Sequence, residues 1–129
     1  MVILTWDPDA WAFWLTDDYF PGIVALDRER TPALSELERA LGPLQVEHVG
    51  IPHDCSDGFL AAYWRRPEAY LDAAMRNPIS SFRDLPDLDE GLRRLEADLR
   101  SGEWERRYGH VRGLAELDPG YRLVTAVLR

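Results

Sequence analysis

Apolar residues form three short runs of strand type along the chain, separated by stretches with helical spacing. Residues 2–6 begin with three consecutive apolar side chains, the pattern of a strand covered on both faces within a parallel sheet. Residues 44–51 alternate apolar and polar side chains as far as His48, which is typical of a half-buried strand. Residues 121–128 form the third expected strand, after the turn signal of residues 118–120.

Helix signals fill the intervals between these runs. Asp7 followed by Pro8 predicts a helix start, and Trp11, Trp14 and Leu15 then share one face. Ser35 and Glu38 have the spacing of a capping box. Two more helices are expected to begin at Phe20-Pro21 and near Asp57. Helical spacing also covers the leucines from 88 to 99 and residues 104–108. The expected helix stops are Gly42-Pro43, Ser101-Gly102 and Gly109.

The segment 51–75 concentrates the polar chemistry of the chain. His53, Cys55 and Asp57 are spaced by two, so an extended backbone would place them on one side, where they could ligate zinc. A cysteine–histidine nucleophile pair is a second alternative. The third is structural: Cys55 is a small buried side chain, Asp57 caps a helix, and His53 and Asp54 hold a turn. The fourth is contact with a substrate.

Composition narrows the classes of partner. The net charge of −8 argues against nucleic acid and anionic membranes, and all fifteen basic residues are arginines, which excludes lysine chemistry. A single cysteine fits a reducing compartment. The chain contains no apolar run of the ~20 residues that a membrane span needs. We expect a cytoplasmic protein of one domain, residues 1–129.

Several stretches resemble one enzyme family. The stretches are Ile51–Phe59 with its continuation Ala62–Leu71, Val2–Pro8 and Gly120–Val124. Together they resemble the C-terminal region of class I, Rossmann-like S-adenosylmethionine-dependent methyltransferases of the methyltransferase-11 kind. The resemblance implies an α/β fold that is a truncated Rossmann-like domain. It has about three strands (2–6, 44–51 and 121–128) in the order first, last, middle, and a helical insert at residues 56–117.

The resemblance also implies a site for the methyl acceptor. The turn after residue 52 would lie over the acceptor, with His53 and Asp54 as polar contacts and with Tyr63 and Trp64 on the apolar side. The tryptophans of the first segment have two readings, either as core or as walls of an apolar pocket beyond the carboxyl end of the first strand. The predicted substrate-binding residues are therefore Trp6, Trp11, Trp14, His53, Asp54, Tyr63 and Trp64.

The sequence lacks the glycine motif that a site for the methyl donor needs. A nucleotide-type cofactor needs a glycine-rich turn after a strand, and none of the nine glycines here is separated from another by one residue. The resemblance places the donor-binding motifs of the family before Met1. We therefore expect no cofactor and no metal to be bound by this chain alone, although the full-length family implies S-adenosylmethionine.

Three functions stay open. The first is the substrate-side half of a small-molecule methyltransferase, truncated or split and inactive alone. The second is a non-catalytic module that binds small molecules or proteins. A weaker third is a hydrolase or metal enzyme built on His53, Cys55 and Asp57. The uncharged run Val2–Leu4 would form an unpaired strand edge, which predicts a homodimer or a complex with the missing half. The other expected partner is a small apolar or aromatic molecule.

Overall fold

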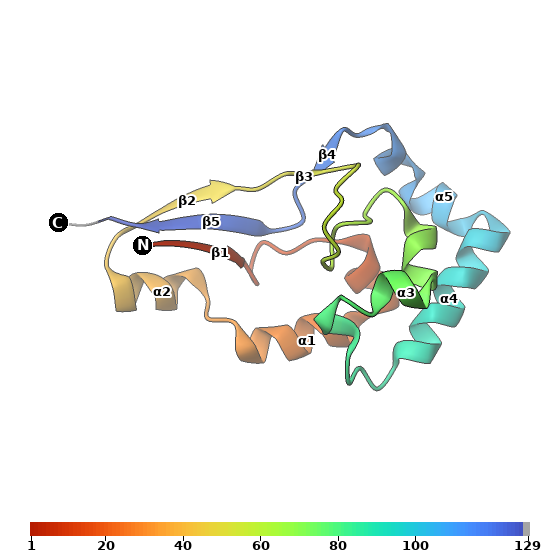
Figure 1. Ribbon diagram of the computed structural model, residues 1–129, viewed down its shortest axis with the longest axis horizontal. Helices are drawn as coiled ribbons and strands as arrows, with labels where there is room; N and C mark the ends of the chain where they lie inside the picture. Colours follow the sequence, from red (N-terminus) through yellow and green to blue (C-terminus); the bar gives the residue numbers. More distant parts are fainter. Residues whose placement is uncertain (128–129) are drawn as a thin grey trace.

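The computed structural model describes residues 1–127 and contains a small antiparallel sheet at one end (Figure 1). Within the described residues this sheet has three strands, β1 (Val2–Trp6), β2 (Leu44–His48) and β5 (Tyr121–Ala126), in the order β1-β5-β2. The predicted strand order is therefore confirmed. Both β1 and β2 run antiparallel to β5. Residue 128, the predicted end of the third strand, lies outside the described residues.

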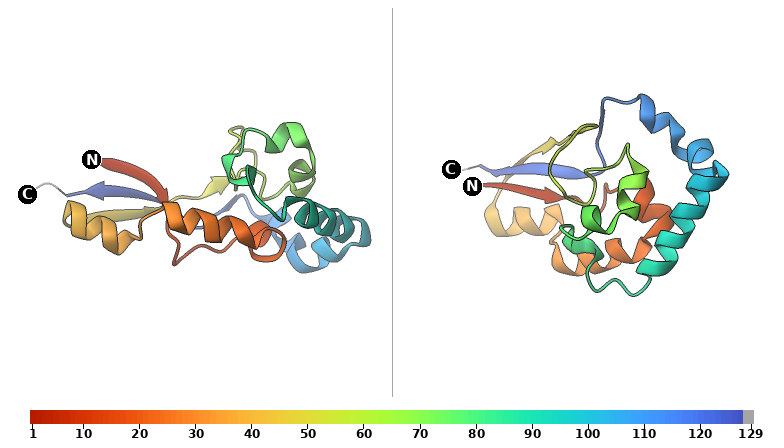
Figure 2. Two further views of the ribbon diagram at one scale, coloured as in Figure 1. Left: turned by 90° about the horizontal axis from the view of Figure 1, so that it is seen from below. Right: turned by 45° about the vertical axis from the view of Figure 1, so that its right-hand side comes forward.

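Helices occupy one side of the sheet and the far end of the molecule. The helices α1 (Pro21–Arg30) and α2 (Leu34–Leu41) run along one side of the sheet, and α3 (Ala73–Arg76), α4 (Leu88–Ser101) and α5 (Glu103–Tyr108) gather at the far end (Figures 1 and 2). Short 3₁₀ or π turns cover Leu15–Tyr19, Pro67–Leu71, Ser80–Phe82 and Gly109–Gly113, and β3 (Ile51–Pro52) pairs with β4 (Glu116–Leu117). Of the helices in residues 1–127, none is long and apolar enough to cross a membrane.

Local signals place three helices correctly. Pro21 stands at the first position of α1, as its preset φ favours. Gly42 ends α2 with a φ of 83°, and Gly102 ends α4 with a φ of 84°, a conformation that glycine adopts without steric cost. The leucine spacing of α4 turns Leu95 fully inward. The predicted ends of these helices are confirmed.

The first strand is not covered on both faces, so that prediction was wrong. Val2 and Leu4 are 62% and 66% exposed, whereas Ile3 lies opposite Val124, which is buried. Alternate side chains of a strand point to opposite faces, so three consecutive apolar residues here serve one covered and one open face. The predicted strand 44–51 is also interrupted, because β2 ends at His48 and Ile51 pairs instead with β4.

Two predicted helix starts are turns. Asp7 accepts a hydrogen bond from the backbone of Asp9, and the backbone N–H groups of Asp7 and Ala12 donate to carbonyls of the 118–120 turn. These bonds replace the helical ones, so the helix predicted from Asp7 was wrong. Asp57 likewise opens no regular helix, since turns lead from it to Pro67. In α2 the capping position belongs to Ala33, so Ser35 lies inside the helix and caps nothing.

Aromatic side chains dominate the core. Trp14 packs edge-on against Trp104, Tyr70 and Tyr19, with ring centroids 5.2 to 6.0 Å apart. Trp64 is fully buried and its indole N–H donates to the carbonyl of Ile51 at 2.9 Å. Trp14 donates in turn to the carbonyl of Trp64 at 2.9 Å. The segment 56–66 is therefore wound around buried rings, and these rings hold it without regular secondary structure.

Candidate functional site

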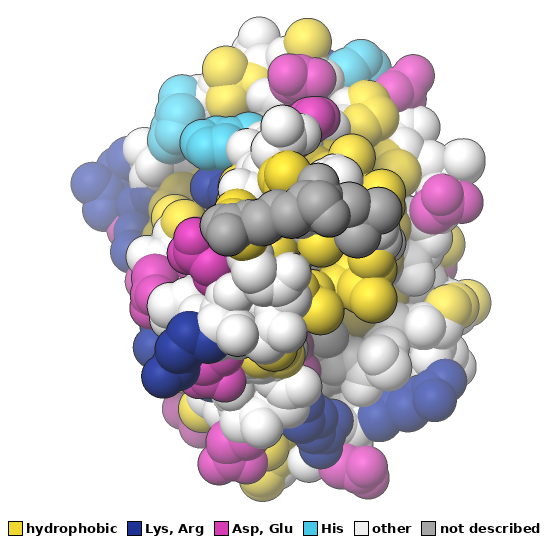
Figure 3. Space-filling view, turned by 90° about the vertical axis from the view of Figure 1, so that its left-hand side faces the viewer, with side chains coloured by type: hydrophobic (Ala, Val, Ile, Leu, Met, Phe, Trp, Pro, Cys, Tyr) yellow, Lys and Arg dark blue, Asp and Glu magenta, His cyan; other side chains and the backbone are white. Residues whose placement is uncertain are grey.

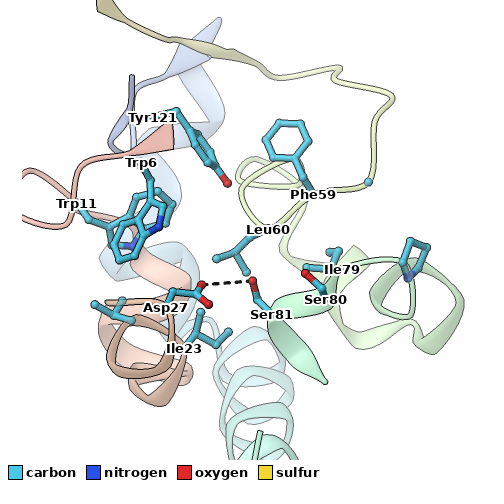
Figure 4. A pocket seen from close by; sticks show the side chains of 13 residues that line it. Trp6, Trp11, Ile23, Asp27, Phe59, Leu60, Ile79, Ser80, Ser81 and Tyr121 are labelled. Atoms are coloured by element: carbon cyan, nitrogen blue, oxygen red, sulfur yellow. Dashed lines mark hydrogen bonds between the residues drawn. The ribbon is translucent and has the colours of Figure 1, made fainter. Parts of the chain in front are cut away.

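A cavity of about 250 Å³ lies where β1 ends and β5 begins (Figure 4). Trp6 is the last residue of β1 and Tyr121 the first of the antiparallel β5, so both lie at the same end of the sheet. In open α/β sheets the crevice beyond the carboxyl ends of strands is the usual ligand site. The lining residues are Trp6, Trp11, Ile23, Val24, Asp27, Gly58, Phe59, Leu60, Pro78, Ile79, Ser80, Ser81 and Tyr121.

Four aromatic rings form a continuous wall of this cavity. Trp6 packs edge-on against Trp11 at 5.5 Å, Trp11 against Tyr121 at 5.4 Å, and Tyr121 against Phe59 at 5.6 Å between centroids. The indole N–H of Trp6 donates to the hydroxyl of Thr31 at 2.8 Å, and that of Trp11 to the hydroxyl of Thr16 at 2.9 Å. Because both N–H groups are bound to protein partners, the tryptophans offer their apolar ring surfaces to a ligand.

The wall depends on close approach between two loops. Gly120 has a φ of 133°, and a Cβ atom at this position would lie 2.9 Å from the ring of Trp11 and 3.0 Å from its Cα. Only glycine permits this backbone and this approach. The N–H of Ala12 donates to the carbonyl of Pro119 at 2.9 Å, and the guanidinium of Arg28 donates to the carbonyl of Pro8 at 2.7 Å. The loop that carries Trp11 is thus fixed against β5 and α1.

The floor of the cavity carries a carboxylate. Asp27 comes from α1 and Ser81 from the turn after α3, and the hydroxyl of Ser81 donates to the Asp27 carboxylate at 3.5 Å (Figure 4). Burial raises the pKa of Asp27, while Arg30 and the Ser81 hydroxyl oppose that rise. Burial also raises the pKa of Tyr121 to about 12, with a smaller contribution from the charge of Asp27. The phenol of Tyr121 therefore stays protonated at neutral pH and is a donor, and the carboxyl oxygens of Asp27 are acceptors in the same cavity.

This arrangement suits a small molecule with an apolar body and a polar group. The aromatic wall supplies apolar contact, and Asp27, Ser81 and Tyr121 supply a few directed hydrogen bonds, the usual composition of a ligand pocket. A carboxylate in such a place accepts a hydrogen bond from a ligand O–H or N–H group. Aspartate is also one of the side chains that act as general bases in enzymes.

Of the predicted site residues, Trp6 and Trp11 line the cavity and five do not. Trp14 and Trp64 are 5% and 0% exposed and belong to the core, as the alternative reading of Trp14 had it. Tyr63 is buried as well, with its ring against Tyr70 at 5.5 Å. These three side chains belong to the core because they are buried among other side chains and do not line the cavity. Whether any predicted residue contacts a substrate stays a prediction.

His53 and Asp54 lie elsewhere. Both are exposed, and the backbone N–H of His53 donates to the carbonyl of Ala115, next to β4. The pairing of β3 with β4 carries this turn away from the cavity lining. Across residues 1–127, no group of three His, Cys, Asp or Glu side chains is placed to hold a metal ion. The zinc alternative for His53, Cys55 and Asp57 therefore gains no support.

Sequence reasoning did not single out Asp27, Phe59 or Ser81. Asp27 carries a usable signal, because it lies four residues after buried Ile23 and so shares its helix face. A carboxylate on the apolar stripe of a helix is unusual and marks a candidate site. Ser81 carries none, since 54 residues separate it from Asp27 and only the tertiary fold joins them.

A second depression, of about 370 Å³, lies beside α3 and the start of α4. Its lining is Arg76, Asn77, Ile79, Phe82, Arg83 and Leu88. One of its two arginines, Arg76, donates to the carbonyl of Tyr70 at 2.9 Å and so has a structural role. Since this depression is away from the strand ends, we place the candidate site in the first cavity.

The chain is similar to one solved structure over nearly its whole length. That structure is the "Putative methyltransferase from antibiotic biosynthesis pathway" of Anabaena variabilis, with 42% sequence identity and a TM-score of 0.84. The match covers 98% of this chain and 54% of the other protein, so the chain spans about half the length of that relative. No family model matches the chain, and no curated protein matches it either. The α/β fold is therefore methyltransferase-like.

Proposed function

We propose that residues 1–129 form the acceptor-binding part of a small-molecule, S-adenosylmethionine-dependent methyltransferase. The observation that carries the proposal is the aromatic-walled cavity at the strand ends of a chain that is 42% identical to part of a protein named "Putative methyltransferase". In this proposal Trp6, Trp11 and Tyr121 hold the body of the acceptor. Asp27 accepts a hydrogen bond from the nucleophilic O–H or N–H group and so orients it.

The described residues do not fit the methyl donor. A donor of nucleotide type needs glycines in a turn that follows a strand and opens a helix. In residues 1–127 the glycines with positive φ, which are Gly42, Gly102 and Gly120, end helices or precede β5 instead. We therefore propose that another stretch of polypeptide, in the same chain or in a partner, holds the donor.

Calorimetry tests the claim about the donor. Purified residues 1–129 titrated with S-adenosylmethionine should release no heat above dilution. Micromolar affinity would show that these residues hold the donor unaided. The experiment leaves the acceptor cavity untouched, so each half of the proposal has its own test.

Ligand-observed NMR tests the cavity. A set of small aromatic molecules should contain weak binders of the wild-type chain, and two variants should lose them. Trp11→Leu removes part of the wall, and Val24→Phe fills the cavity from α1. Leu114→Ala, a change at an exposed position outside the lining, is the matched control. Binding that survives both cavity variants places the ligand elsewhere and rejects the proposal.

The proposal includes association through β1. Within the described residues this strand is an edge of the sheet, paired only with β5. Exposed Val2 and Leu4 lie near exposed Met1, at the end of the molecule where hydrophobic side chains gather in Figure 3. An apolar edge strand without charge or proline favours pairing with another chain. For the isolated polypeptide we therefore propose a homodimer, in which β1 pairs with a second copy of the chain across a twofold axis.

A further inference from the structure

The geometry of the cavity also points to a chemical class of ligand. We infer that it binds a small arylalkylamine, with the protonated nitrogen at Asp27 and the ring against Trp6, Trp11 and Tyr121. The inference rests on the proposed function in one respect, since it concerns the same cavity. It goes further because it selects amines over alcohols and acids of the same shape.

The first argument is the unmet acceptor capacity of Asp27. A carboxylate has about four acceptor positions. The hydrogen bond that the cavity lining gives it comes from Ser81 at 3.5 Å, which is long for an O–H donor. Among the ion pairs within residues 1–127, none includes Asp27. Arg30, on the same helix, acts on Asp27 through its charge but forms no ion pair with it. A carboxylate that is partly removed from water and has no directly paired cation favours a ligand that supplies one.

The second argument is the aromatic wall. Cations are attracted to the π surface of tryptophan and tyrosine rings, and the attraction grows where water is displaced. Trp6, Trp11 and Tyr121 are consecutive members of one edge-on series, and they line the same cavity as Asp27. The indole N–H donors, which would favour an anion, are bound to Thr31 and Thr16. The wall and the carboxylate thus select the same charge.

The size of the cavity limits the ligand. An apolar cavity of roughly 150 Å³ holds benzene. A cavity of about 250 Å³ then has room for one aromatic ring and a short aminoalkyl arm. An acidic ligand is disfavoured both by Asp27 and by the net charge of −8.

Tryptophan fluorescence gives a direct test with three probes of matched shape. The probes are 2-phenylethylamine, 2-phenylethanol and phenylacetate, each titrated into the full 129-residue chain at neutral pH. Since a charge-assisted hydrogen bond is stronger than a neutral one, we expect the amine to bind about tenfold more tightly than the alcohol. Phenylacetate should bind most weakly. Asp27→Asn should remove the preference for the amine, while Glu29→Gln, a charge change on the exposed side of the same helix, should preserve it.

The outcomes separate the two proposals. Equal binding of amine and alcohol, unchanged by Asp27→Asn but lost in Val24→Phe, overturns the amine inference and leaves the acceptor cavity standing. Failure of the wild-type chain to bind any of the three probes overturns the amine inference. Amine binding that is sensitive to Asp27→Asn but not to Val24→Phe also overturns it, because the amine would then lie outside the cavity.

Discussion

Asp27 combines a stability cost with the binding role that we propose for it. Its raised pKa means that the folded chain disfavours the ionised carboxylate. The native state then binds a proton more readily than the unfolded state does. The contribution of this group to stability is therefore fully present below its ordinary pKa of 3.8 and is lost as the pH rises through the higher folded value. A residue that costs stability at neutral pH fits a functional position.

Asp27→Asn should therefore stabilise the chain at neutral pH. The gain should be at most about 1 kcal/mol, because Asp27 is partly exposed and keeps part of its solvation. Urea unfolding at pH 7 and near pH 4 measures the difference, which should shrink at the acid end. Glu29→Gln, exposed on the same helix, should change little at either pH. A variant less stable than wild type at pH 7 would show that the carboxylate supports the fold.

Trp64→Ala should strongly destabilise the fold. The side chain is 0% exposed, and its N–H donates to the carbonyl of Ile51, which would lose its partner. Truncating a buried aromatic residue costs about 3–5 kcal/mol, a large share of the total stability of a small domain. A loss below about 1 kcal/mol in chemical denaturation would contradict this placement. Trp6→Ala, at a partly exposed position, should cost less and serves as the comparison.

At the scale of elements, the contact between α4 and the turn Leu15–Tyr19 depends on one glycine. A Cβ atom at Gly91 would lie 2.3 Å from the ring of Phe20 and 2.6 Å from the carbonyl of Tyr19. The hydroxyl of Tyr19 also donates to Asp98 on α4 at 2.6 Å, so the two elements are tied at a second point. The helix approaches the turn this closely only because residue 91 has no side chain.

Gly91→Ala should therefore destabilise the protein, although alanine is favoured over glycine by about 1 kcal/mol inside a helix. We expect a net loss of about 1–3 kcal/mol, the usual cost of overpacking, measured by thermal or urea unfolding. Gly113→Ala is the matched control, because a Cβ atom there meets nothing within 4 Å. A Gly91→Ala variant that is more stable than wild type would show that the contact is loose.

Elements with local signals could be predicted, and elements held by distant partners could not. Pro21, Gly42 and Gly102 mark helix ends through their own backbone preferences, so α1, α2 and α4 follow from sequence. The segments 7–13 and 56–66 carry similar signals. The first segment, however, donates hydrogen bonds to the 118–120 turn, and the second is bound to the side chains of Trp14 and Tyr70, which lie outside it. Pattern reasoning has no access to such bonds.

The candidate site also contains residues that could be predicted from the sequence and residues that could not. Trp6 and Trp11 could be placed at a pocket because they follow a strand end, where α/β folds hold ligands. Trp14 and Trp64 could not be separated from them by residue type, since both classes are aromatic and only packing sorts core from lining. The Asp27–Ser81 pair joins residues 54 apart in the chain and depends on the whole fold.

At the scale of the whole molecule, the apolar edge strand β1 predicts self-association of the isolated chain. Leu4→Lys places a charge on the edge strand at a side chain that is already 66% exposed, so the fold should survive. Light scattering at micromolar concentration should show a dimer for wild type and a smaller species for Leu4→Lys. Leu114→Lys, at an exposed leucine away from the sheet, should leave the dimer intact. A wild-type monomer would reject association through β1.

The central claim is that the cavity at the end of β1 binds the ligand, and backbone chemical-shift mapping tests it most directly. A ¹⁵N-labelled chain is titrated with the tightest aromatic binder of the wild-type protein. The account predicts that the largest shifts fall on Trp6, Trp11, Asp27, Phe59, Ser81 and Tyr121, which come from six separate segments and all line this cavity. Shifts concentrated instead on Arg76, Phe82 and Arg83, or on the exposed face of β1, would contradict it.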